Sequence, residues 1–181
     1  GQSLTALQAE AASISKSSKK KSRDEAISNV IKLSKNMMLS TREIIKKLNL
    51  GLIDDLGFES ALIELFENWK RRFTGVEFEY EFDEKAIKKI TKKKTAHLYR
   101  IFQEALTNIA KHSEPKNIQI NVKYLEVNGK TRILISNDGI KNEISNLEGL
   151  GLIGIAERVD QINGTLEISK KKLFKIIINL S

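Results

Sequence analysis

Three polar side chains recur at helical spacing in the segment FQEALTNIAKHS, residues 102–113. Glu104, Asn108 and Lys111 lie three or four residues apart, so a helix with about 100° per residue places them on one face, with His112 at its edge. Such a face offers a carboxylate, an amide and a cation in line, groups that can exchange protons and hold a charged ligand. The opposite face is apolar, and any amphipathic helix has a polar side, so the stripe alone is also compatible with a structural role.

Glycines later in the chain favour a phosphate-binding site over that structural role. The segment ISNDGI ends an expected strand and contains Asn137 and Gly139, and the segment EGLGLIGIAERV contains Gly149, Gly151 and Gly154. Glycines ahead of a helix let backbone amides approach a phosphate, and the helix N-terminus favours its negative charge. The evidence for a phosphate-binding site is much stronger when three features occur together than when one occurs alone. These are a polar helix, a strand that ends in a polar residue before Gly, and a helix that starts with Gly-x-Gly-Leu.

The first part of the chain is expected to be a helical hairpin. Residues 1–48 contain no proline and two sets of apolar residues at helical spacing, separated by the polar stretch 15–23. Two such helices rarely bury both apolar stripes alone, so pairing with a second copy into a dimeric four-helix bundle is the expected solution. A further helix is expected from Phe58 onward, after Gly51 and Gly57. We therefore assign residues 1–70 to a dimerisation hairpin and its linker.

The second part mixes strands and helices. Residues 76–82, VEFEYEF, alternate strictly and predict a strand, and a helix is expected over 95–112. The runs NIQINVKYLEV and KTRILIS flank Asn128-Gly129, which predicts a β-hairpin with a type I′ turn. A helix near 151–162 and a final strand pair complete the pattern. Residues 71–181 are therefore expected to form an α/β sandwich with a mixed sheet, and the chain as a whole is α+β in class.

Composition excludes some classes of site. The chain has no cysteine, so it has no thiol nucleophile, disulfide or thiolate-bound metal. The formal net charge is +8, with lysines clustered at 16–23 and 85–94, but no aromatic residues are interleaved to stack bases, so these are expected to be loop or surface lysines and no nucleic acid is expected. No run of about 18 apolar residues is present. The chain starts without a methionine, and we expect it to be part of a longer protein.

Several segments resemble one family. LYRIFQEALTNIAKHS resembles the N-box of the GHKL ATPases, in the form used by sensor histidine kinases that act on response regulators of the NarL/LuxR type. ILISNDGI is similar to their first glycine box, and EGLGLIGIAERVDQINGTLEI closely resembles their second. KLNLGLIDDLGFESALIELFENW resembles the segment that links their dimerisation helices to the ATPase domain. GQSLTAL matches the end of their His-Asp-x-Leu-Gly-Gln-x-Leu phosphoacceptor box.

The resemblance implies roles for particular residues. Asn108 would ligate the Mg²⁺ that bridges the ATP phosphates, and Glu104 would be the general base. Lys111 and His112 would face phosphate oxygens. The loop 140–148 would be a mobile lid over ATP. The positions implied to bind ATP are Asn108, Lys111, His112, Asn137, Gly139, Gly149, Gly151 and Leu152.

The sequence departs from the family pattern in two places. The aspartate that accepts a hydrogen bond from the adenine amino group is replaced by Asn137, while Asp138 is expected to point to the other face of the strand. A hydrogen bond to a neutral amide is weaker than one to a carboxylate, so Asn137 is expected to weaken adenine recognition modestly. Its amide nitrogen also donates, so it is expected to relax selection against guanine. The phosphoacceptor histidine would lie four residues before Gly1. Gln2 matches the glutamine of the family's Asp-x3-Gln phosphatase motif, whose aspartate would also precede the chain.

The function implied is that of the cytoplasmic kinase core of a two-component sensor histidine kinase. It would form a homodimer, bind ATP and Mg²⁺, and transfer the γ-phosphoryl group to the upstream histidine and then to an aspartate of a NarL/LuxR-type response regulator. Any contact with a membrane would come only through segments absent from this sequence. The alternative that the residues leave open is a non-catalytic dimeric regulatory scaffold that binds nucleotide weakly, which Asn137 favours and which Glu104 and Asn108 oppose.

Overall fold

The chain folds into two compact units. The computed structural model describes residues 2–16, 21, 23–37, 53, 56–139, 150–170 and 172–181. The first unit comprises Gly1–Leu52 and the second Ile53–Ser181. The expected division at residues 70 and 71 therefore lies too far along the chain, because the helix that follows Gly57 belongs to the core of the second unit. Among the described helices, none is both long and apolar enough to cross a bilayer.

The described part of the first unit consists of two helical stretches. Helix α1 spans Gln2–Lys16, and residues 23–37 are also helical. The side chain of Asn29 donates a hydrogen bond to Glu10 at 3.2 Å, so the two stretches are in contact. A groove between them is lined by Ala6, Ala9, Glu10, Ser13, Asn29, Lys32, Leu33 and Asn36. The expected continuation of the second helix to residue 48 lies outside the described residues.

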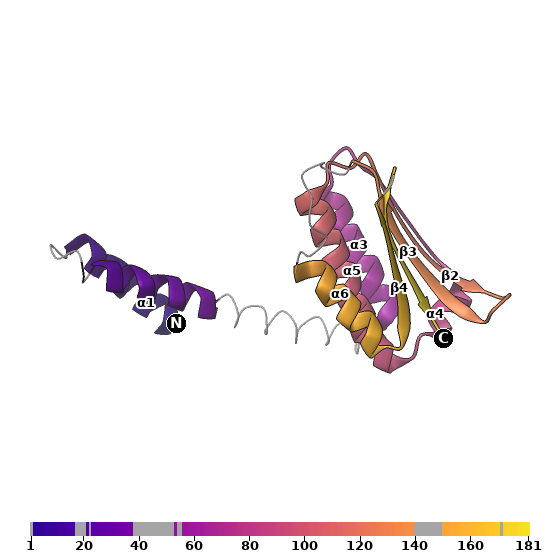
Figure 1. Ribbon diagram of the computed structural model, residues 1–181, viewed down its shortest axis with the longest axis horizontal. Helices are drawn as coiled ribbons and strands as arrows, with labels where there is room; N and C mark the ends of the chain where they lie inside the picture. The colour runs from indigo at the N-terminus through magenta and orange to yellow at the C-terminus, as the bar shows by residue number, and fades with distance from the viewer. Residues whose placement is uncertain are drawn as a thin grey trace. The chain divides into compact units, whose positions relative to one another are not determined.

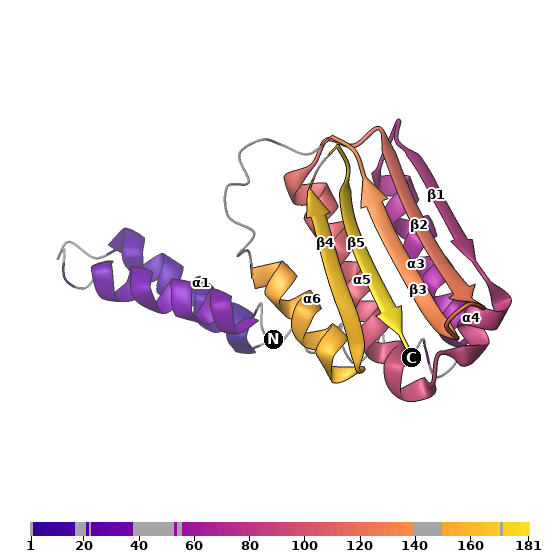
Figure 2. The same ribbon diagram turned by 45° about the vertical axis from the view of Figure 1, so that its right-hand side comes forward.

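A five-stranded mixed sheet organises the second unit. Its strands are β1 (Glu77–Phe82), β2 (Asn117–Leu125), β3 (Lys130–Asn137), β4 (Gly164–Lys170) and β5 (Phe174–Leu180). They lie in the order β1-β2-β3-β5-β4, with β1 parallel to β2 and every other pair antiparallel (Figure 2). The alternation expected for 76–82 is present in β1, where Phe78 is buried and the glutamates are exposed. The mixed sheet expected from the sequence is confirmed.

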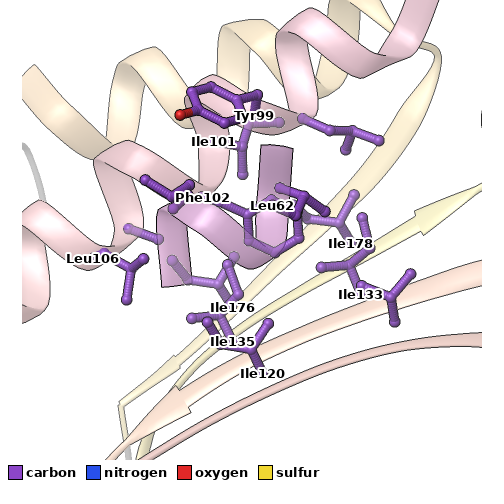
Figure 3. Close-up of a cluster of buried hydrophobic side chains, with 14 of the residues drawn as sticks. Leu62, Tyr99, Ile101, Phe102, Leu106, Ile120, Ile133, Ile135, Ile176 and Ile178 are labelled. Atoms are coloured by element: carbon purple, nitrogen blue, oxygen red, sulfur yellow. The ribbon is translucent and has the colours of Figure 1, made fainter. Parts of the chain in front are cut away.

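Three helices cover one face of this sheet. They are α3 (Phe58–Arg72), α5 (Lys92–His112) and α6 (Leu150–Gln161), and both views show them on the same side (Figures 1 and 2). The register places one residue of each strand in a row across the inner face: Tyr80, Ile120, Ile135, Ile176 and Ile168. Helix side chains, including Leu62, Phe102 and Leu106, meet strand isoleucines in the buried core (Figure 3). This packing holds α5 rigidly against the sheet.

The lysine cluster at 85–94 is not a loop. Residues Glu84–Lys89 form a short helix, α4, and Lys92 begins α5. Asp83 caps α4, because its carboxylate accepts hydrogen bonds from the backbone N–H groups of Lys85 and Ala86 at 2.8 and 3.4 Å. Of the two expectations for these lysines, loop or surface, the second is confirmed: Lys85, Lys88 and Lys89 are exposed, but on a short helix.

The turn between β2 and β3 also differs from the expectation. Leu125 pairs with Lys130, so four residues rather than two connect the strands. A type I′ turn requires a positive φ at both central residues. Gly129 has a φ of 67°, but the φ of Asn128 is not positive. The N–H of Gly129 donates to the carbonyl of Leu125 at 2.8 Å. The Asn-Gly pair therefore supplies one left-handed residue to a longer turn.

Candidate functional site

Helix α5 presents Glu104 and Asn108 beside its buried face. Its core residues repeat at helical spacing and are almost fully buried: Leu98, Ile101, Phe102, Ala105, Leu106 and Ile109. Glu104 and Asn108 are half-buried, while Lys111 and His112 in the last turn are exposed. The helix begins at Lys92, three residues before the expected start, and ends at His112 as expected. The apolar face therefore fixes the direction in which the polar pair points.

The start of α6 lies directly against this polar pair. A Cβ atom added to Gly151 would fall 2.4 Å from the Glu104 carboxylate oxygen Oε1 and 2.8 Å from the Asn108 amide oxygen Oδ1. Only a glycine permits so close an approach. Gly151 is the second residue of a 12-residue helix, so its N-terminal N–H groups and positive dipole end lie beside the carboxylate and the amide. Segments more than 40 residues apart thus form one site.

The amide of Asn108 has capacity for a ligand. Its nitrogen Nδ2 is buried and has no hydrogen-bond partner among the described residues. Buried side-chain polar atoms in proteins are rarely left unsatisfied, so each exception requires an explanation. A half-turn of the amide presents its oxygen at the same place, and amide oxygens are suitable ligands for Mg²⁺. The donor type present at Asn108 therefore fits a magnesium ion.

That magnesium ion would need further ligands from elsewhere. In the described residues, no group of three or more histidine and carboxylate side chains is arranged to hold a metal. Mg²⁺ commonly takes only one or two protein ligands and keeps water and substrate phosphates as the others. The site next to Asn108 and the α6 N-terminus suits that kind of coordination, because the helix end favours phosphate groups.

Gly139 brings the end of β3 to the end of α5. It has φ +70°, and an added Cβ atom would fall 2.0 Å from the carbonyl oxygen of Glu114. Its own carbonyl accepts a hydrogen bond from the N–H of Glu114 at 2.8 Å. A side chain at this position is excluded by both the backbone conformation and the lack of space. The residues that follow α5 are thereby tied to the strand that carries Asn137.

Asn137 and Asp138 point to different surroundings. Asn137 is only 2% exposed and lies on the inner face of the sheet, in the row that includes Ile118 and Phe174. Asp138 instead accepts hydrogen bonds from the N–H groups of Lys116 and Asn117 at 2.7 and 2.9 Å. Burial alone would raise the pKa of Asp138, but these bonds and one from the Asn117 side chain lower it below its ordinary value.

The role of Asp138 was not foreseen from the sequence. Its carboxylate connects the residue after β3 to the first residues of β2, which lie about twenty positions earlier in the chain. A polar residue directly after a strand is a weak signal for such a clamp, since its partner is set by the pairing of strand ends. Of the other expected site residues, Leu152 is half-buried and packs against the hydrophobic core. Gly149, the loop 140–148 and the side chain of Gln2 lie outside the described residues.

Comparison with known families identifies this architecture. Residues 93–180 match the family described as histidine kinase-, DNA gyrase B-, and HSP90-like ATPase. This part of the chain is similar to the ATPase domains of that family. The matched region contains α5, the four strands β2 to β5 and α6, and hence Glu104, Asn108, Asn137 and Gly151. The matched region therefore includes every described element that contributes to the candidate site.

Curated relatives with the same domain are sensor histidine kinases. The chain is 32% identical over 126 residues to the sensor histidine kinase MctS of Rhizobium johnstonii, covering 67% of this chain and 26% of that protein. It is 26% identical over 153 residues to the oxygen sensor histidine kinase NreB of Staphylococcus carnosus, covering 82% of this chain and 44% of that protein. The chain thus spans less than half the length of these relatives.

A solved structure shares the fold over nearly the whole chain. The histidine kinase domain of the blue-light activated histidine kinase from Erythrobacter litoralis EL346 superposes with a TM-score of 0.63. The comparison covers 97% of this chain and 92% of that one, at 14% sequence identity. At that identity the likeness shows the fold alone and carries no statement about function or residues.

Proposed function

We propose that the chain is the ATP-binding and dimerising core of a two-component sensor histidine kinase. The observation that carries this proposal is the contact of Gly151 with Glu104 and Asn108, which joins a helix N-terminus, a carboxylate and an amide in one site. The ATPase family match and the names of the relatives support it. Because ATP and response regulators are found in the cytoplasm, the proposal includes a cytoplasmic location for this core.

Each residue of the site would have its own role in binding Mg²⁺ and ATP or in the proton transfer. Asn108 would ligate Mg²⁺, which when bound supplies positive charge to the phosphate oxygens. The N–H groups at the start of α6, with Gly149, Gly151 and Leu152, would bind and orient the phosphates. Lys111 and His112, exposed at the end of α5, would donate to phosphate oxygens, and Asn137 and Gly139 would lie beside the base. Glu104 would accept the proton of the attacking group.

Nucleotide binding is tested by calorimetry on the 181-residue protein. Wild type should bind ATP more tightly with Mg²⁺ than with a chelator, and Asn108→Ala should remove most of that difference because the amide ligand is lost. Thr107→Ala is the matched control, since the Thr107 hydroxyl donates to the carbonyl of Gln103 within the same helix at 2.7 Å. If wild type and Asn108→Ala respond equally to Mg²⁺, the assignment of Asn108 is wrong.

Phosphoryl transfer would use an acceptor histidine outside residues 1–181. The resemblance of GQSLTAL to a phosphoacceptor box supports a histidine before residue 1 as the acceptor and Gln2 as part of a phosphatase motif. In a longer protein that includes this histidine, Glu104→Gln should lower the rate of radiolabel incorporation from ATP while ATP affinity stays within about twofold, because the proton acceptor is lost and the phosphate contacts remain. Equal rates would remove Glu104 from the chemistry.

The partner would be a response regulator of the NarL/LuxR type. This finer statement rests on the form of the N-box and of the second glycine box, with the Glu157-Arg158-Val159 sequence. Phosphate transfer from the longer protein to a panel of purified response regulators, followed over time, tests it. Preferred transfer to a regulator of another output class would contradict the proposed pairing.

One observation favours the alternative of a nucleotide-weak scaffold. The position at which the family carries a carboxylate for adenine holds the neutral amide of Asn137. The same calorimetry separates the two functions, because a scaffold would show no Mg²⁺-dependent ATP binding. The Gly151 contact opposes this alternative, since it places a helix N-terminus, which favours phosphate, beside a carboxylate and an amide.

A further inference from the structure

Strand β1 forms one edge of the sheet (Figure 2). It pairs with β2 on one side, and no described segment pairs with its other side, which we call the open edge. The N–H groups of Glu77 and of Asp83, directly after the strand, donate to carbonyls of β2 at 2.8 Å or its flank. Consecutive strand residues point their backbone groups to opposite sides, so the N–H and C=O groups of Phe78, Tyr80 and Phe82 face the open edge.

Partly buried aromatic side chains lie along the inner side of the open edge. The Phe66 ring of α3 is fully buried, and its centroid lies 5.4 Å from that of Tyr80 and 5.7 Å from that of Phe82. The apolar side chains of β1 and of the segment before it that the core covers only in part are Trp69, Phe73, Val76, Tyr80 and Phe82. The core is therefore incompletely covered here, and an added strand would remove more apolar surface from water.

The outer side of the same edge is acidic. Glu77, Glu79 and Glu81 alternate with the aromatic residues along β1 and are exposed. Lys123 of β2 lies 2.9 Å from Glu81, but the β2 residues opposite Glu77 and Glu79 are neutral. The ion pairs among the described residues do not include Glu77 or Glu79. These two carboxylates are therefore placed to pair with cations on an added strand.

The charges decide between possible occupants of the open edge. A second copy of β1 would set glutamate beside glutamate, because directly opposite residues of paired strands point to the same face of the sheet. The other edge strand, β4, carries Glu167 in the middle of its outer face, so a second copy's β4 would also bring like charges together. A segment with Lys or Arg at alternate positions instead places cations beside Glu77 and Glu79, and its apolar residues beside the aromatic rings.

We propose that the open edge of β1 binds, as an additional strand, an extended segment of a partner protein in which basic and apolar residues alternate. Main-chain hydrogen bonds to Phe78, Tyr80 and Phe82 supply the pairing, and the glutamates of the outer face select the partner. This surface is separate from the nucleotide site, since β1 precedes the matched residues 93–180. The proposal is therefore independent of the proposed ATP binding.

The probe is a fluorescent peptide of alternating lysine and valine, seven residues long and blocked at both ends. Its fluorescence anisotropy should rise when the 181-residue protein is added. A peptide with glutamate in place of lysine should bind at least about tenfold more weakly, because its charges repel those of β1. The lysine peptide N-methylated at every residue keeps its charges but donates no backbone hydrogen bond, and it should also bind at least about tenfold more weakly.

Hydrogen exchange measured by NMR locates the bound peptide. With saturating lysine peptide, the amides of Phe78, Tyr80 and Phe82 should exchange at least about tenfold more slowly, because their N–H groups gain partners. The amides of Glu79 and Glu81 face β2 and should change by less than about twofold. This alternation separates strand addition from attraction by charge alone.

Matched variants test the acidic stripe. Glu77→Gln combined with Glu79→Gln should weaken binding of the lysine peptide by about three- to tenfold, because two cross-strand ion pairs are lost. Glu167→Gln combined with Asp160→Asn removes two exposed charges elsewhere and should leave binding within about twofold of wild type. All four positions are exposed, and thermal melting checks that both proteins fold.

The proposal fails if the lysine peptide does not bind at millimolar concentration. It also fails if the N-methylated peptide binds equally well, or if no amide of β1 gains protection, because the peptide is then held by charge alone. Equal loss of binding in the two double variants would mean that the β1 glutamates do not select the partner. If the lysine peptide converts a dimeric protein to the monomer, a second copy occupies the open edge instead.

Discussion

Gly151 and Gly154 of α6 differ in what a side chain at each position would contact. At Gly151 an added methyl group would collide with the Glu104 carboxylate and the Asn108 amide from another helix. At Gly154 the nearest atom would be the Arg158 guanidinium nitrogen at 2.9 Å, at the far end of a flexible side chain. Both contacts are with side-chain atoms, but those at Gly151 are closer and come from two half-buried residues of another helix, whereas that at Gly154 comes from its own helix.

The variant Gly151→Ala should separate these two cases. Alanine is about 1 kcal/mol better than glycine in a helix interior, but overpacking against α5 costs about 1–3 kcal/mol, so the melting temperature should fall or stay level. ATP affinity, measured by titration with Mg²⁺, should fall by at least about tenfold because the helix start moves away from Asn108.

Gly154→Ala is the control for Gly151→Ala. It gains the same helix propensity, while Arg158, which donates to the Gly154 carbonyl at 2.6 Å, can shift aside. We expect unchanged or higher thermal stability and ATP affinity within about twofold of wild type. An alanine at Gly151 that leaves ATP binding intact would argue that the close contact is not part of a nucleotide site.

At the level of elements, Asp83 joins α4 to the sheet. Its carboxylate accepts a hydrogen bond from the N–H of Tyr124 at 3.2 Å in addition to those from the first turn of α4. The hydrogen bond from Tyr124 is the largest cause that lowers the pKa of Asp83 below its ordinary value of 3.8. Burial raises the pKa, but the bond from Tyr124 together with the smaller contributions from Lys85 and Ala86 outweighs it. One residue thus caps a helix and pins the end of a strand.

The lowered pKa of Asp83 predicts a pH dependence of stability. As the pH falls, the unfolded chain takes up the proton first, so the stabilisation is complete above the ordinary value and is lost as the pH falls through the lower folded value. The melting-temperature difference between wild type and Asp83→Asn should therefore be largest near about pH 6 and should shrink below about pH 4. Asp160→Asn, an exposed carboxylate on α6, controls for lost charge. A difference that stays constant down to low pH would contradict this.

Periodicity predicted the helices and strands of the second unit better than it predicted which of them pack together. The apolar and polar faces of α5 and the alternating burial along β1 both follow from local residue spacing, and both are present. Helix α3 has an equally clear stripe, but a stripe shows only that a helix packs, and it was assigned to the linker although Phe66 lies in the core at 5.2 Å from the Phe102 ring centroid. The bond from Asn137 to the Asp138 carbonyl was beyond reach for a related reason, since it depends on backbone geometry at a strand end.

At the scale of the whole molecule, the two units differ in how they bury apolar surface. The second unit has a continuous core beneath three helices. In the described part of the first unit, Ala26 is buried, while Leu4, Ile27 and Ile31 are 56%, 42% and 51% exposed. Ile27 and Ile31 are four residues apart and so lie on one face of their helix. Leu33, by contrast, lines the groove between the two helical stretches of the same chain.

Because Ile31 is exposed whereas Leu33 packs within its own chain, Ile31 is the residue at which we test the proposed homodimer. The protein should be a dimer at micromolar concentration, and Ile31→Asp should shift it to the monomer because pairing would bury an unpaired charge. Light scattering after size-exclusion chromatography measures the mass, and ATP titration checks that the second unit remains folded. Val127→Asp is the matched control, since Val127 is a fully exposed aliphatic side chain at the tip of the β2–β3 turn and should leave the dimer intact. A monomeric wild type, or equal loss of the dimer in both variants, would contradict dimerisation through this face. Retained ATP binding in a monomeric Ile31→Asp protein would further show that the nucleotide site is complete within one chain.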